Sequence, residues 1–104
     1  MQIALVDTFV VPESSREEFL KNVRFSAEHI RTIPGFVEGN VFERVGGEGR
    51  FSVVTTAVWK DRAAFEAARQ AVGAMFQRIG FNPPEVMQKL GVQLDRSVYE
   101  RTSY

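Results

Sequence analysis

The apolar residues of the chain change their spacing several times, and the order of these changes is the feature that most limits its fold. Apolar residues at every second position are typical of strands, and apolar residues at every third or fourth position are typical of helices. The first kind of spacing predicts strands over Ile3–Val11, Phe36–Arg44 and Phe51–Lys60. A last strand is expected over Val92–Arg101, which is more polar, as is typical of an edge strand or of one that meets a partner. The second kind predicts helices over Ser15–Thr32, from a cap at Asp61 to Ile79, and over Glu85–Leu90.

The residues between these segments predict where the helices begin. Ser14 and Glu17 have the spacing of a capping box at a helix start, and Ser15 with Glu18 offers a second register. Asp61 is a suitable N-cap for the second long helix. A glycine-rich run between the second and third strands predicts a hairpin turn.

The order strand, helix, strand, strand, helix, short helix, strand is that of a ferredoxin-like α+β fold. Such a chain forms a four-stranded antiparallel sheet with both long helices on one face. The 104 residues contain no linker and no low-complexity segment, so we expect a single domain over residues 1–104.

The first and third predicted strands are apolar on both faces, which indicates that both faces of the sheet are covered. The helices cover one face, and we expect a second copy of the chain to cover the other, giving a homodimer through the sheet faces. Asp7 interrupts the apolar pattern of the first strand. Either this carboxylate lies near a strand end and is hydrogen-bonded or reached by water, or it is buried, so that desolvation raises its pKa and it acts as a base.

The composition excludes several classes of site and partner. The chain has no cysteine and one histidine, which excludes a disulfide scaffold, a thiol nucleophile and a cysteine-ligated zinc site, and we expect no metal. Thirteen basic and thirteen acidic residues give a net charge of 0, unlike a nucleic-acid-binding protein. No apolar run approaches the ~20 residues of a membrane span, and the first residues lack the features of a signal peptide, so we expect a cytoplasmic protein.

No motif of a known hydrolase, phosphate site or dinucleotide site is present. Asn40 is in phase with Phe36 and Phe42 on a predicted strand, where asparagine is disfavoured, so it faces solvent or holds a ligand. His29 and Phe25 lie one helical turn apart and point either to solvent or into a pocket.

Aromatic residues near the end of the second long helix are also candidates. Phe76 and Phe81 either fill the core or close the mouth of a cavity between the helix and the sheet. Trp59 at a strand end either packs in the core or lines the same pocket.

Two motifs resemble those of the antibiotic biosynthesis monooxygenase family. The segment Ile33-Pro-Gly-Phe36 follows the first predicted helix, and a strand that ends in Trp59 precedes a capped helix with Phe65 six residues after the tryptophan. Members of this family are small dimeric α/β barrels of about this length. The resemblance implies cofactor-independent oxygenation of phenols, quinols or anthrones with O2, or, in one branch of the family, haem degradation.

The residues at the family's site positions match only in part, and their departures argue against the second of these activities. In the haem-degrading branch an asparagine on the first strand, a tryptophan on the third and a histidine on the next helix form the site. Asp7, Trp59 and either Arg69 or Gln70 stand at these positions, and neither Arg69 nor Gln70 is a haem ligand, so the resemblance implies no cofactor. Some anthrone-oxidising members have an asparagine four residues before the tryptophan, where this chain has Thr55.

We interpret the sequence as that of a cofactor-independent monooxygenase of a small aromatic compound. An electron-rich phenol that has lost its proton can reduce O2 directly, which requires an apolar cavity, an aromatic wall and a proton acceptor. The expected catalytic residues are Trp59, His29 and Asp7. The expected substrate-binding residues are Asn40, Thr55, Phe25 and Phe76. Two alternatives remain open, a non-catalytic dimeric ligand-binding or accessory protein, and an isomerase or cyclase of a polyketide-like substrate.

Overall fold

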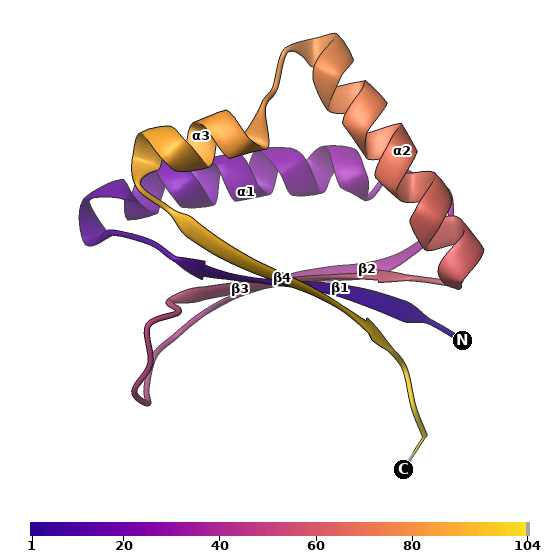
Figure 1. The fold of residues 1–104 in the computed structure, drawn as a ribbon, viewed down its shortest axis with the longest axis horizontal. Helices are drawn as coiled ribbons and strands as arrows, with labels where there is room; N and C mark the ends of the chain where they lie inside the picture. Colours follow the sequence, from indigo (N-terminus) through magenta and orange to yellow (C-terminus); the bar gives the residue numbers. More distant parts are fainter. Residues whose placement is uncertain (104) are drawn as a thin grey trace.

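A four-stranded antiparallel sheet forms the base of the structure, and three α-helices cover one of its faces (Figure 1). The computed structural model describes residues 1–103. Its elements follow the chain as β1 (Ile3–Val10), the 3₁₀ helix η1 (Glu13–Ser15), α1 (Arg16–Ile30), β2 (Phe36–Glu43), β3 (Val53–Trp59), α2 (Arg62–Ile79), α3 (Pro83–Leu90) and β4 (Gln93–Glu100). The predicted ferredoxin-like α+β fold is confirmed.

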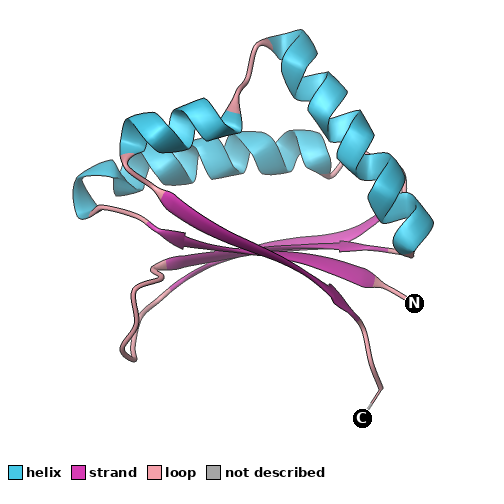
Figure 2. Ribbon diagram, in the orientation of Figure 1, coloured by secondary structure: helices cyan, strands magenta, loops and turns pink. Residues whose placement is uncertain are grey.

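The strands lie in the order β2-β3-β1-β4, and every neighbouring pair is antiparallel. The two strands that are apolar on both faces, β1 and β3, are therefore the two central ones. Figure 2 shows that all the helices lie on the same side of the sheet. We call the side without helices the open face; its residues include Val6 on β1, Phe42 on β2, Val54 on β3 and Tyr99 on β4.

The helices contribute few fully buried residues. α1 buries Phe19, α2 buries Phe65, Ala68 and Phe76, and α3 buries none completely. No helix in residues 1–103 has both the length and the apolar character that crossing a bilayer demands.

The cap of α2 follows the sequence prediction, whereas the cap of α1 does not. Asp61 Oδ1 accepts a hydrogen bond of 2.8 Å from the Ala64 N–H, which confirms the predicted cap. Ser15 precedes α1 but makes no capping bond, because its φ of −103° and ψ of −2° are helical rather than extended. Its hydroxyl instead donates to the carbonyl of Leu90 at 2.7 Å. The predicted capping box is therefore wrong, and Ser15 connects the start of α1 to the end of α3.

The turn after α1 needs a glycine for two reasons. Gly35 has a φ of 89°, which disfavours other residues. A Cβ at this position would also lie only 2.6 Å from the Cβ of Ala64 on α2. The Pro34-Gly35 step thus ends α1 and lets the following strand pass close to α2.

The buried core is divided into two clusters. One cluster joins Ile3 and Trp59 on the sheet to Phe65 and Ala68 on α2. The other joins Phe9 and Val53 on the sheet to Phe19 on α1. The clusters lie at opposite ends of the central strands, because Ile3 is paired with Trp59 and Phe9 is paired with Val53.

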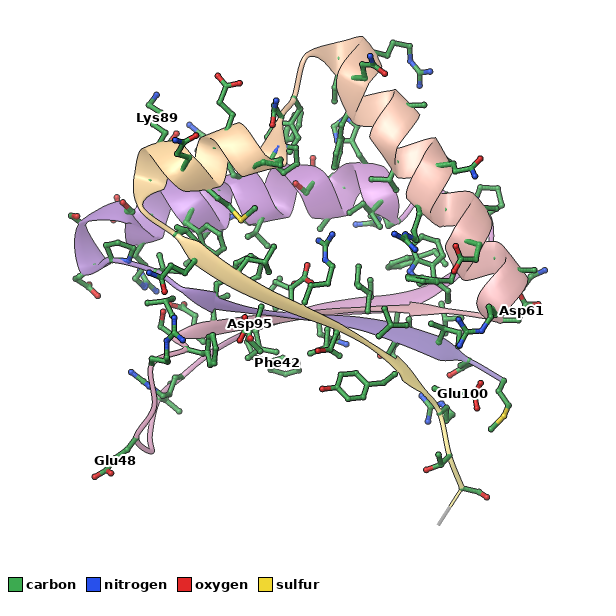
Figure 3. The ribbon with its side chains drawn as sticks, in the orientation of Figure 1. Phe42, Glu48, Asp61, Lys89, Asp95 and Glu100 are labelled. Carbon is green, nitrogen blue, oxygen red and sulfur yellow. The ribbon has the colours of Figure 1, made fainter. Side chains whose placement is uncertain are left out.

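A bulge in β2 shifts the side chains of this strand. Phe36 is paired with Trp59, but Glu38, and not Val37, is paired with the next residue of β3. After the bulge, Asn40 and Phe42 share the open face, whereas Phe36 faces the helices and packs edge-on against Trp59 at 5.5 Å between ring centroids. Figure 3 shows Phe42 on the side of the sheet away from the helices. The expectation that Asn40 is in phase with Phe36 is wrong for this reason.

Candidate functional site

A cavity of about 520 Å³ lies between the helices and the sheet. This volume is within the range of small-molecule sites. Its lining includes Phe9 and Phe19 of one core cluster, and Phe36 and Ile30, which pack at the other. The cavity therefore occupies the space between the two halves of the core.

The floor of the cavity is built from two rows of residues that cross the sheet. One row, which we call the polar row, consists of Val41, Thr55, Asp7 and Arg96, which are paired across β2, β3, β1 and β4. The next row contains Gly39, Ala57 and Leu5. Glycine has no side chain and alanine has only a methyl group, so Gly39 and Ala57 leave space for a ligand beside the polar row.

Asp7 and Arg96 form an ion pair in the polar row. The Arg96 Nε donates to Asp7 Oδ1 and Nη2 donates to Oδ2, both at 2.8 Å. Asp7 is only 8% exposed, and this bidentate geometry is the strongest form of a carboxylate–guanidinium contact. The pKa of Arg96 is raised above its ordinary value, mainly because its guanidinium donates hydrogen bonds to Asp7. Asp7 is therefore a hydrogen-bonded carboxylate, and each of its oxygens keeps a lone pair that can accept a proton from a ligand.

Arg96 keeps capacity for a further ligand. A guanidinium has five N–H groups, and Asp7 engages one on Nε and one on Nη2. The side chain of Arg96 is 57% exposed, and the residue lines the cavity. The chemistry available at the floor is therefore anion binding by Arg96, with Asp7 fixing its orientation and offering a proton acceptor.

Aromatic rings form part of the wall opposite the sheet. The rings of Phe76 and Phe81, which both line the cavity, meet edge to face at 5.0 Å. Phe25 packs on Phe81 at 5.0 Å and on His29 at 4.5 Å. The structure thus gathers Phe25, His29 and Phe76 into one aromatic row, with Phe81 as the link.

Only some of the predicted site residues line the cavity. Asp7, Thr55 and Phe76 do so with side chains on the cavity side. Phe25 and His29 are not among the described residues that line it, and His29 Nδ1 lies 2.9 Å from the carbonyl of Phe25. The prediction that His29 and Phe25 point into the pocket is wrong, because they stand behind Phe81.

Trp59 and Asn40 are also placed differently from the prediction. Trp59 is 3% exposed within the core cluster of Ile3 and Phe65, and it is not among the residues that line the cavity, so it forms no wall. Asn40 borders the cavity, but the bulge turns its side chain to the open face. There its Nδ2 donates to Thr56 Oγ1 at 3.2 Å and to Glu38 Oε2 at 3.3 Å. Neither residue is placed to hold a ligand in the cavity.

Arg96 is the site residue that sequence reasoning missed. The predicted fourth strand is polar, and its arginine resembled an ordinary residue of an exposed edge. The available signal was an unexplained carboxylate on the first strand together with a basic residue on a strand expected in the same sheet. Only the register, in which Asp7 is paired directly with Arg96, joins the two observations.

Comparison with known proteins gives a family and several structural neighbours. The family model described as antibiotic biosynthesis monooxygenase matches residues 2–78. No curated protein matches the sequence significantly. SnoaB, a cofactor-independent oxygenase from Streptomyces nogalater, is 22% identical with a TM-score of 0.72, and the match covers 99% of this chain and 95% of that chain.

Two further solved structures extend the range of similar folds. A conserved protein from Methanosarcina mazei Go1 is 17% identical with a TM-score of 0.74, over 98% of this chain and 94% of that chain. A haem-degrading protein from Mycobacterium tuberculosis is 23% identical with a TM-score of 0.59, over 66% of this chain and 78% of that chain. At these identities the structural matches establish a common fold.

Proposed function

This chain belongs to the antibiotic biosynthesis monooxygenase family, and on that premise we propose that it is a cofactor-independent monooxygenase that oxidises a small aromatic compound with O2. The observation that carries the proposal is the Asp7–Arg96 pair on the floor of a largely apolar cavity. The similarity to the Streptomyces nogalater oxygenase supports the same reaction class.

The ion pair suits the first step, which is loss of a proton from the aromatic hydroxyl. In this mechanism the hydroxyl donates to an oxygen of Asp7, each of which retains a lone pair beside its bond to Arg96. The positive charge of Arg96 lies where the phenolate charge develops and stabilises it. Deprotonation makes the ring electron-rich enough to reduce O2.

The apolar walls suit the second step, in which the anion reacts with O2. Phe36, Phe76 and Phe81 surround the ring and exclude water from the reactive intermediate. For an anthrone-like substrate, a CH2 carbon loses two hydrogens and gains one oxygen atom of O2 as a carbonyl. The second oxygen atom takes up the two protons and leaves as water, so that the four electrons lost by carbon reduce O2.

Haem chemistry fits this chain poorly. An axial imidazole is the usual ligand, and His29, the one histidine, stands behind Phe81 rather than at the cavity. Arg69 and Gln70 are exposed on α2, outside the cavity lining. We therefore retain the cofactor-independent reaction in the proposal.

The open face supports a homodimer as part of the proposal. Phe42 and Tyr99 on this face are each 56% exposed, and Val6 and Val54 lie between them on the central strands. Exposed apolar residues grouped on one sheet face are typical of an interface. Two copies packed through these faces, each a single domain over residues 1–104, would enclose the apolar surface and leave both cavities on the outside of the sheet pair.

Oxygen uptake by the purified, metal-free protein with a panel of quinols and anthrones tests the proposed reaction. We expect uptake above the rate of autoxidation, and a loss of at least ~10-fold in Arg96→Gln, since removal of one anion-stabilising donor commonly costs more than this. Arg24→Gln is the matched control, because Arg24 is exposed on α1 and is not among the cavity-lining residues. Absence of uptake across the panel would favour a ligand-binding protein of the same fold.

A further inference from the structure

The charges that line the cavity are unbalanced, although the chain as a whole is neutral. The charged lining residues are Asp7, Arg31 and Arg96, which carry one negative and two positive charges. Asp7 is paired with Arg96, whereas Arg31 makes no ion pair with any residue of the described chain. The cavity therefore has a net positive charge and favours an anionic ligand.

The way in which Asp7 holds Arg96 determines where such an anion binds. A guanidinium has a side edge formed by Nε and Nη2, and an end edge formed by Nη1 and Nη2. Asp7 occupies the side edge completely, with both of its oxygens. The end edge, with its two parallel N–H groups, has no partner in residues 1–103, and it suits two adjacent oxygens.

We propose that the substrate of this cavity carries its ionising hydroxyl next to a carbonyl oxygen, so that the anion binds with both oxygens to the end edge of Arg96. This inference rests on the proposed function, because it identifies which aromatic compounds that site accepts. Arg31, exposed at the C-terminal end of α1, supplies a second positive charge at the border of the cavity and attracts the same anion.

Apolar surface elsewhere in the cavity limits the rest of the ligand. Leu5, Ala57 and Phe36 near the floor and Phe76, Phe81 and Met87 on the helix side provide no charge to pair with a second ionic group. A ligand with one anionic end and an aromatic body matches this distribution. A neutral aromatic of the same size offers the end edge of Arg96 only uncharged acceptors, and its hydrogen bonds to the guanidinium are weaker than those of an anion.

Binding of 2-hydroxy-1,4-naphthoquinone, compared with its neutral 2-methoxy ether, tests the inference without any oxygenation. The hydroxy compound ionises in weak acid, carries a carbonyl beside the ionised oxygen and is already oxidised. We expect the anion to bind at least about tenfold more tightly than the ether at pH 7.5, a difference typical of charge-assisted hydrogen bonds. The visible spectrum of the bound quinone should also show that its hydroxyl ionises at a lower pH than in water.

Three variants separate the end edge from charge and from folding. Arg96→Lys keeps the charge but lacks the edge, and we expect it to lose most of the preference. Asp7→Asn combined with Arg96→Gln removes both charges of the pair, so that no buried carboxylate is left alone, and we expect only the small preference for the anion that Arg31 contributes. Arg24→Gln should retain the full preference.

The outcomes distinguish this inference from the proposed reaction. Equal affinity of the wild type for both quinones, failure of both to bind at millimolar concentration, or a preference that survives undiminished in the double variant would overturn the inference. A preference lost with Arg96, in a protein without oxygen uptake, would support the anion site and contradict the oxygenase. Oxygen uptake that depends on Arg96, without any preference for the anion, would support the oxygenase and contradict the anion site.

Discussion

Asp7 and Arg96 lie directly opposite each other on β1 and β4, and two hydrogen bonds of 2.8 Å join their side chains across 89 positions of sequence. The pair connects the edge strand β4 to a central strand at the floor of the cavity. It is therefore part of the sheet as well as of the site, and its two roles can be measured separately.

Loss of Arg96 alone should destabilise the fold more than loss of the whole pair. Arg96→Gln leaves the carboxylate of Asp7, 8% exposed, without its partner, and we expect a cost of about 1–3 kcal/mol in the free energy of unfolding. This value lies below that for a fully buried pair, because the Arg96 side chain is 57% exposed. Adding Asp7→Asn should recover most of the loss in urea denaturation, and a double variant as unstable as the single one would contradict this account.

Filling the floor of the cavity should remove binding and leave the fold intact. Ala57 stands between Gly39 and Leu5 in the row beside the polar residues, and Ala57→Leu places three more carbon atoms in open space. We expect affinity for 2-hydroxy-1,4-naphthoquinone to fall at least ~10-fold, with a melting temperature equal to or above that of the wild type. Ala63→Leu on the exposed surface of α2 is the control and should bind normally. Unchanged binding in Ala57→Leu would place the ligand elsewhere.

The hydroxyl of Ser15 should stabilise the junction of α1 and α3. Ser15→Ala removes its hydrogen bond to the Leu90 carbonyl, which we expect to cost about 1 kcal/mol and to lower the melting temperature by roughly 4–8 °C. Ser14→Ala is the matched control, since Ser14 is exposed in η1. A larger effect at Ser14 would restore the capping box that the structure lacks.

A charge on the open face should prevent the proposed association of two copies. Phe42→Asp places a carboxylate among the apolar residues of this face, and we expect sedimentation to show a monomer where the wild type is a dimer. Val45→Asp, in the fully exposed hairpin, should leave the dimer unchanged. A wild-type protein that is monomeric at about 100 μM would contradict the dimer.

The pair of Glu43 and Arg16 should make a small, pH-dependent contribution to stability. Hydrogen bonding from Arg16 lowers the pKa of Glu43 below its ordinary value. The pair therefore stabilises the fold fully above the ordinary glutamate value of about 4.3 and loses this effect as the pH falls through the lower value in the folded state. We expect the melting temperatures of wild type and Glu43→Gln to differ slightly at pH 7 and to converge near pH 3, with Glu28→Gln as the exposed control on α1. A difference that grows on acidification would contradict this sign.

Local features of the fold were predictable from the sequence because each depends on neighbouring residues. The cap at Asp61 requires only the next turn of α2, and the end of α1 requires only the Pro34-Gly35 step. The alternation of strand and helix spacing likewise gave the order of elements. The limits of individual elements differ from the prediction by a few residues at their ends.

The geometry of the site depends on register, and this is what the sequence pattern did not contain. The pairing that brings Asp7 to Arg96, and the bulge that turns Asn40 to the open face, are set by how distant strands align. The positions of Trp59 and His29 relative to the cavity were also not predictable from the sequence pattern. Each is close in sequence to cavity residues but does not line the cavity itself; Trp59 packs on the cavity residue Phe36, and His29 packs on Phe25, which contacts the cavity residue Phe81.

The bulge in β2 also determines how this chain should be compared with its relatives. Val37 is the extra residue, so a relative with one residue fewer at this place would form a regular strand and still present every later side chain to the same face. An alignment that runs through this point without a gap would instead exchange the two faces of β2. It would assign the counterpart of Asn40 to the cavity side of the sheet and that of Gly39 to the open face. Ancestral residues inferred from such an alignment would combine positions that lie on two different surfaces.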